Sequence, residues 1–119
     1  MPIEPRIPHD DLVVTHAVVE GDQAKYITTL AEPDGTVVAM IGFHKGSPVE
    51  GWHGWTTAHV LRALIAHMEY FQTTPFGKDP NARAQNERIL EGLHMALDAT
   101  KARVDDRKER GVLYDTEKV

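Results

Sequence analysis

The segment Asn86–Gly111, "NERILEGLHMALDATKARVDDRKERG", decides the C-terminal half of the fold. A stripe of residues spaced alternately by three and four runs through it: Leu90, Leu93, Leu97, Thr100 and Val104. Continued backward, the same spacing reaches Asn86, and continued forward it reaches Arg107 and Gly111. This period predicts one amphipathic helix that ends near Gly111, because glycine readily adopts the left-handed conformation that terminates helices.

A second helix is predicted immediately upstream of this segment. Either Thr56 or Thr57 can cap it, and its apolar residues again have a period near 3.6: Val60, Leu61, Leu64, Ile65, Met68 and Phe71. The loop "TTPFGKDPN" follows, and the long helix begins around Asp79 or Asn81, with a proline tolerated in its first turn. Residues 56–111 are therefore expected to form an antiparallel hairpin of two helices.

The region 12–44 is rich in β-branched residues and predicts a small antiparallel sheet of two to three strands. The expected strands are Leu12–Val19, Lys25–Leu30 and Thr36–His44. The Pro33-Asp34-Gly35 turn before the last of these is the clearest hairpin signal. Residues 1–11 contain three prolines and predict an irregular arm. The fold class is thus α+β, with a sheet followed by a helical hairpin.

Length and composition restrict the possible functions. A chain of 119 residues with 41% hydrophobic residues predicts a single domain spanning 1–119, with a small core that self-association would enlarge. The net charge of -5 disfavours binding to a nucleic-acid polymer. The absence of cysteine favours a cytoplasmic location, and no apolar run is long enough to cross a membrane.

Catalytic and metal-binding patterns are missing from the sequence. The chain has seven histidines, but His59 and His67 are eight residues apart and no HExxH or similar motif occurs. No nucleophile is accompanied by a recognisable base and orienting group, and no phosphate-cradling loop is present. We therefore expect a protein that is not an enzyme and that needs no metal or cofactor.

Three arginines lie at helical spacing near the C-terminus. Arg103, Arg107 and Arg110 follow one another at intervals of four and three, which places their guanidinium groups on one helix face. Arg103 and Arg107 can form a cationic clamp for phosphate. The alternative is a solvated face whose arginines pair with Asp106, Glu109 or a neighbouring subunit, which is the common role of charges at a helix end.

Two phenylalanines flank the loop between the predicted helices. Phe71 and Phe76 can stack on a flat base, an interaction worth about 1–3 kcal/mol per base. Their simpler role is to close the end of the helical core, and from the residues alone this structural role is favoured for both.

The sequence resembles a known family. The segment "GFHKGSPVEGWHGWTTAHVLRALIAHMEYFQ", then "PF", then "ALDATKARVDDRKERGV", is similar to the bacteriophage Thoeris anti-defence proteins, which share a helical hairpin with the phage anti-CBASS sponge proteins. The resemblance covers residues 41–112. It implies a protein of the infected bacterium's cytoplasm that sequesters cyclic ADP-ribose isomers and, in some members, cyclic oligonucleotides. It also implies homodimers or hexamers with ligand sites shared between protomers.

The same resemblance assigns candidate ligand-binding residues. An aromatic residue at the end of the first helix corresponds to Phe71, and two arginines four residues apart correspond to Arg103 and Arg107. An asparagine at the start of the second helix corresponds to Asn81 when counted from Phe71, and to Asn86 when counted back from Arg103. Both remain candidates because this chain is longer than the family pattern between Phe71 and Arg103.

Two functions follow from these patterns. The first is a non-catalytic sponge that binds a cyclic nucleotide signal and inhibits bacterial defence. The second is a structural or regulatory module that self-assembles or binds a host protein and has no nucleotide ligand. A third hypothesis, a metal-dependent enzyme that uses the histidines, lacks a supporting motif.

Overall fold

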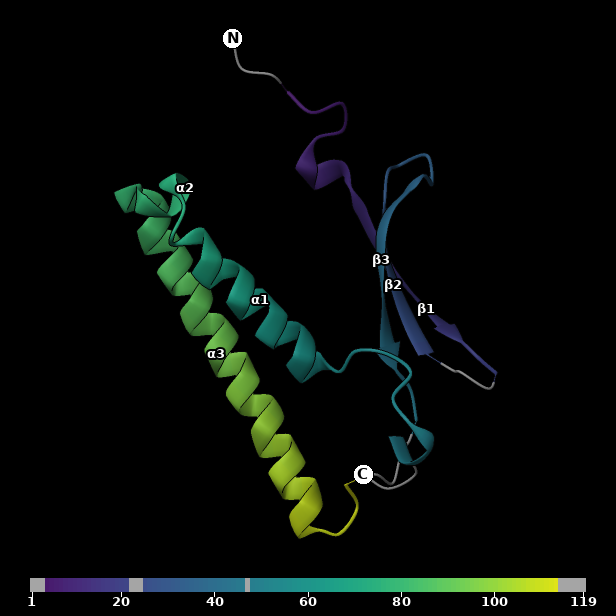
Figure 1. Ribbon diagram of the computed structural model, residues 1–119. Helices are drawn as coiled ribbons and strands as arrows, with labels where there is room; N and C mark the ends of the chain where they lie inside the picture. Colours follow the sequence, from purple (N-terminus) through teal and green to yellow (C-terminus); the bar gives the residue numbers. More distant parts are fainter. Residues whose placement is uncertain (1–3, 22–24, 47, 114–119) are drawn as a thin grey trace. The chain divides into compact units, whose positions relative to one another are not determined.

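The computed structural model describes residues 4–21, 25–46 and 48–113 (Figure 1). A three-stranded antiparallel sheet precedes the helices, so the α+β class predicted from the sequence is confirmed. The chain divides into two compact units, Met1–Trp55 and Thr56–Val119. The first contains the sheet and the second contains the helices, while the single domain stays a prediction.

The three strands follow one another in the sheet in the order β1-β2-β3, with β1 at Val13–Val19, β2 at Lys25–Ala31 and β3 at Val37–His44. Each bound lies within one residue of the prediction. In the β2–β3 turn, the Gly35 N–H donates to the Glu32 carbonyl at 2.9 Å, and Gly35 has a φ of 94°. This left-handed conformation explains why the turn signal contains a glycine.

A short segment after β3 returns to the sheet and covers part of its edge. The Trp55 N–H donates to the Gly42 carbonyl at 2.9 Å, and the His44 N–H donates to the Trp55 carbonyl at 2.8 Å. Gly54 allows this approach, since a Cβ there would lie 2.7 Å from the Gly42 carbonyl oxygen. Gly54, between the two tryptophans, therefore serves close backbone packing.

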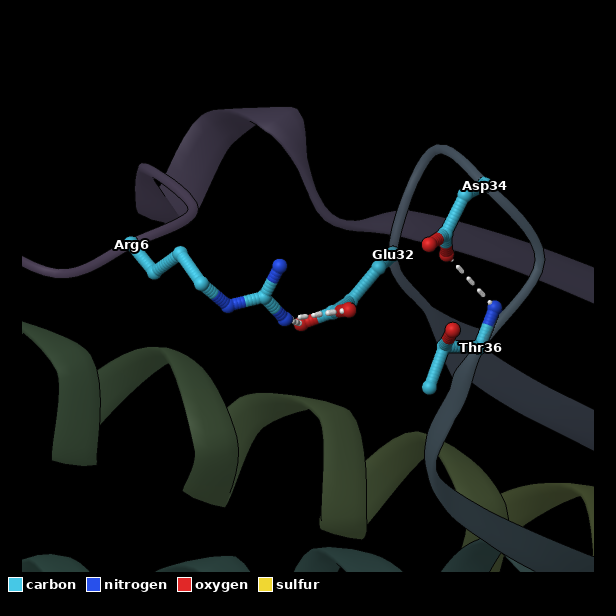
Figure 2. A network of polar contacts seen from close by, with 4 residues as sticks. All are labelled: Arg6, Glu32, Asp34 and Thr36. Atoms are coloured by element: carbon cyan, nitrogen blue, oxygen red, sulfur yellow. Dashed lines mark hydrogen bonds and ion pairs between the residues drawn. The ribbon is translucent and has the colours of Figure 1, made fainter.

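The N-terminal arm contacts the base of the β2–β3 turn at Glu32 (Figure 2). The Arg6 guanidinium forms an ion pair with the Glu32 carboxylate, which raises the pKa of Arg6 further above its usual range. Beside it, the Thr36 N–H donates to Asp34 Oδ1 at 2.9 Å. This hydrogen bond lowers the pKa of Asp34. Next along the arm, His9–Asp11 form a short 3-10 helix.

The second unit contains three helices with well-defined N-termini: α1 at Thr57–Phe71, α2 at Pro75–Lys78 and α3 at Pro80–Glu109. Thr56 caps α1 through its hydroxyl, and Asp79 caps α3 by accepting from the Ala82 N–H at 3.0 Å. At the other end, α3 stops before Gly111, whose φ is 73°. The predicted start signals of both long helices and the predicted stop signal of α3 are confirmed.

The expectation of only two helices is wrong for the described chain, because α2 lies inside the segment predicted as a loop. Thr74 caps α2, and a proline occupies its first turn, the same arrangement that starts α3. Gly77 of α2 packs so closely that an added Cβ would lie 2.0 Å from the Phe71 carbonyl oxygen. Because this segment has two prolines and a glycine in nine residues, its sequence predicted a loop and not a helical turn.

The α1 and α3 helices contact one another. The least exposed positions of α3 include Asn86, Leu90, Leu93, Leu97 and Thr100. However, α3 has 30 residues and α1 has 15, which correspond to lengths of about 45 and 22 Å. The C-terminal part of α3 therefore continues beyond α1 in this unit (Figure 1).

Few of the described side chains are deeply buried. Ile65 and Ala82 are the buried hydrophobic residues, and Asn86 is the buried polar residue. Among the described residues up to Trp55, none is buried. Since apolar burial is the main favourable contribution to folding, this distribution leaves large apolar surfaces exposed in a single copy.

Replacing Gly77 with alanine is expected to destabilise the helical unit. The added Cβ would meet backbone atoms of Phe71 and Gln72, which cannot move as a flexible side chain would. We expect the free energy of unfolding to fall by about 1–3 kcal/mol. Lys101→Ala, at an exposed position of the same unit, is the control and should change the free energy of unfolding by less than about 0.5 kcal/mol. Equal effects of the two substitutions on chemical denaturation would contradict this packing.

Acid is expected to loosen the β2–β3 turn through Asp34. The hydrogen bond lowers the pKa of Asp34 in the folded state below its unfolded pKa of 3.8. Its stabilisation of the fold is therefore complete above pH 3.8 and is lost as the pH falls through the folded-state pKa. The amide resonance of Thr36 should shift over that range in an NMR titration. Asp34→Asn keeps an acceptor oxygen without a titrating group, so its Thr36 resonance should stay constant, and an unchanged titration in this variant would refute the assignment.

Candidate functional site

One group of candidate residues lies where α1 ends. The Phe71 ring is tilted against the His67 ring at a centroid distance of 4.4 Å and against the Phe76 ring at 5.8 Å. Phe71 is half-buried, whereas Phe76 on α2 is 60% exposed. The three rings form an aromatic cluster that is accessible from the Phe76 side, so both the structural and the stacking roles are compatible with the geometry.

Asn86 lies beside this cluster, on the face of α3 that contacts α1. Only 5% of its surface is exposed, and its side-chain N–H donates to Gln72 Oε1 at 3.3 Å. Gln72 also donates to the Arg83 carbonyl at 3.5 Å, so a polar contact joins the end of α1 to the start of α3. Asn81, by contrast, is exposed in the first turn of α3. Of the two candidate asparagines, only Asn86 is held next to the end of α1.

Gln72 is a residue that sequence reasoning missed. The polar position Asn86 on an otherwise apolar stripe predicted a partner, because buried polar groups require one. The sequence offered no means of identifying that partner across the helix pair. Among the described residues, no buried side-chain nitrogen or oxygen lacks a hydrogen bond, which accounts for the polar group in the stripe.

The candidate arginines lie at the opposite end of α3. Arg103 is exposed, while Arg107 is half-buried and donates to the Val112 carbonyl at 2.8 Å. Arg110 pairs with Asp106 at 2.9 Å, as the structural alternative expects for this end of the helix. The guanidinium groups of Arg103 and Arg107 are thus on neighbouring turns, and Arg107 is oriented by the chain that leaves the helix.

The length of α3 separates the two groups of candidates within one chain. Arg103 follows Asn86 by 17 residues, which corresponds to about 25 Å along the helix axis. A ligand the size of a cyclic dinucleotide spans far less than this distance. In a single copy, the aromatic and amide groups therefore cannot contact the same small ligand as the arginines.

Other sites in the described chain are less developed. A hollow of about 190 Å³ opens on the sheet, lined by Val14, Thr28, Thr29, Leu30, Ala39, Met40 and Ile41. Its accessible lining is almost entirely apolar and includes no charged side chain. Among the described residues, no group of three or more His, Asp or Glu side chains is placed to hold a metal ion. No described helix is both long and apolar enough to span a bilayer.

The hydrogen bond between Asn86 and Gln72 is expected to contribute to stability. Gln72→Leu leaves the buried Asn86 amide without its partner and should lower the free energy of unfolding by about 1–3 kcal/mol. Adding Asn86→Leu replaces both polar groups and should recover most of that loss. Chemical denaturation of the single and double variants measures this coupling, and strictly additive effects would show that the bond is unimportant.

Neither a family model nor a curated protein sequence matches this chain.

Proposed function

We propose that this protein is a non-catalytic sponge that binds a cyclic nucleotide second messenger and thereby inhibits a bacterial antiphage defence. The favoured ligands are cyclic ADP-ribose isomers, followed by cyclic oligonucleotides. The sequence resemblance to phage Thoeris anti-defence proteins suggests this function, and the arrangement of the candidate residues supports it. The protein would act in the cytoplasm of the infected cell as a homodimer or a hexamer, with α1 and α3 as the hairpin.

The observation that supports the proposal most is the pair Arg103 and Arg107 on successive turns of α3. Planar guanidinium groups bind phosphate oxygens in a bidentate manner, and two of them one turn apart match two linked phosphates. The hydrogen bond from Arg107 to the Val112 carbonyl orients one guanidinium before any ligand arrives. The open side of the Phe71–Phe76 pair would stack on a base.

The separation between these groups requires that two chains build each site. When two α3 helices pair antiparallel, the start of one lies beside the end of the other. The phosphate-binding end of one chain then meets the aromatic end of its partner, and a two-fold axis generates two equivalent sites. Asn81, which is exposed, would then face the ligand from the aromatic end, whereas Asn86 would support the site from within through its hydrogen bond to Gln72.

A flank of α3 is suited to this pairing. It lies beside the stripe that contacts α1 and has a heptad spacing, through Gln85, Ile89, Gly92, Ala96, Ala99 and Arg103. All six positions are exposed, and the three central residues, a glycine and two alanines, are small. Small side chains let two helices approach closely. With Ala96 on the two-fold axis, Ile89 lies opposite the partner's Arg103, and Gln85 lies opposite the partner's Arg107. The arginines thus reach the neighbourhood of Asn86 in the other chain.

Ligand binding is expected to raise the melting temperature of the protein. A ligand at 100 times its dissociation constant adds about 2.7 kcal/mol of stability, so a thermal-shift panel of cyclic ADP-ribose isomers and cyclic oligonucleotides should identify the ligand. The double variant Arg103→Ala/Arg107→Ala should lose the shift. Arg62→Ala, which removes an exposed arginine from α1, should retain it. An unaltered shift in the double variant would exclude the arginine pair as the phosphate site.

The fate of the ligand separates a sponge from a hydrolase. Mass spectrometry after denaturation of the complex should recover the ligand intact, whereas cleaved product would overturn the proposal in favour of an enzyme. If no cyclic nucleotide in the panel stabilises the protein, the self-assembly or host-protein module becomes the better function.

A further inference from the structure

The strand β1 is an uncovered edge of the sheet. In the described part of the chain it pairs with β2 alone, and all seven of its residues are exposed. Native edge strands usually carry a lysine, a proline or a bulge that prevents pairing with other chains. The sequence "VVTHAVV" has no proline and no lysine, arginine or acidic residue. The register irregularity in this sheet lies on the other side, between β2 and β3.

On each face of β1, a valine lies near both ends of the strand. Val14 and Val18 lie on one face and are 67% and 50% exposed, while Val13 and Val19 lie on the opposite face and are also exposed. An antiparallel sheet with a single apolar face has one side for a core and one for solvent. In β1, by contrast, exposed valines lie on both faces of the same edge strand, and pairing with another strand would reduce the exposure of both sets.

The sequence of β1 is nearly symmetric about His16. An antiparallel pair of β1 strands centred on this residue places like beside like, aligning Val13 with the partner's Val19, Val14 with the partner's Val18 and Thr15 with the partner's Ala17. Apart from the pair of His16 residues on the axis, every aligned pair consists of uncharged residues, so no like charges oppose each other. Opposed β-branched residues are favourable cross-strand neighbours.

We propose that β1 is a self-association edge, at which two copies of this chain pair their β1 strands antiparallel about a two-fold axis at His16. The two three-stranded sheets then become one six-stranded sheet, and the partner is a second copy of this chain. This inference does not depend on the nucleotide-binding proposal, because β1 and the arginines belong to different units.

The length of the edge predicts a reversible contact. Seven residues share an edge of about 24 Å, whereas stable interfaces bury about 800 Å² on each partner. Backbone pairing over this distance falls below that area, so the contact should dissociate on dilution unless a second interface reinforces it.

The other edge of the sheet differs, because the Trp55 segment already pairs with Gly42 and His44 of β3.

Engineered cysteines test both the contact and its register. The chain contains no cysteine, so His16→Cys introduces a single thiol that meets its own copy at the two-fold axis. A mixture of Thr15→Cys and Ala17→Cys chains tests the neighbouring pair. Adjacent pairs alternate between the wider and the closer spacing of an antiparallel ladder, so one of these two tests has the geometry that a disulfide needs.

The expected result under mild oxidation is a covalent dimer from His16→Cys alone, from the mixture, or from both, and little dimer from Thr15→Cys alone. Val38→Cys is the control, because Val38 is 53% exposed on the opposite edge strand. Absence of a cross-link in both tests, or equal cross-linking of Val38→Cys, would overturn the proposal.

A charge at the axis gives an independent readout on the unmodified sheet. His16→Lys should weaken association in sedimentation experiments about tenfold or more, because two ammonium groups would meet at the two-fold axis. Val38→Lys places the same charge on the other edge and should leave association unchanged. Equal effects of both lysines, with the folded state verified by circular dichroism, would contradict pairing through β1.

Discussion

A single helix fixes the distance between the two halves of the candidate binding site. Because α3 continues for 30 residues, it holds the Asn86 end and the Arg103 end about 25 Å apart, and α1, with 15 residues, is too short to run along its full length. A small anionic ligand that needs both ends must therefore bind between chains. The proposed function consequently depends on assembly, and loss of assembly should abolish binding even when every ligand-contacting residue is present.

The scarcity of buried residues leads to the same conclusion from the energetic side. A chain whose sheet has no buried residue among those described gains little from apolar burial in one copy. Two surfaces are suited to enlarge that burial: the exposed flank of α3 and the edge of β1. In both proposals the surface pairs with itself about a two-fold axis, and two distinct two-fold contacts join copies into assemblies larger than a dimer, which are closed when the two axes intersect. The hexamers expected from the sequence resemblance are compatible with this combination.

Local signals explain which parts of the fold were predictable. The Pro-Asp-Gly turn, the Thr56 cap and the glycine after α3 act within a few residues, so strand and helix bounds could be placed from the sequence. The helical turn α2 was missed because its capping threonine and first-turn proline resemble a loop. The partner of Asn86 was also out of reach, because Gln72 lies on another helix and only the packing of α1 against α3 brings the two together. For the candidate site, the resemblance named Phe71 and the arginines, but the distance between them emerged only from the length of the continuous helix.

Mixing two defective chains tests the shared site most directly. Phe71→Leu removes the flat ring while keeping an apolar side chain, and Arg103→Ala/Arg107→Ala removes the phosphate clamp. In a mixed dimer one site carries both defects and the other carries neither, so calorimetry on the re-equilibrated mixture should recover ligand binding at one intact site per mixed dimer. Each variant alone should fail to bind. If the mixture binds no better than the separate variants, the site does not lie between two chains and the account is wrong.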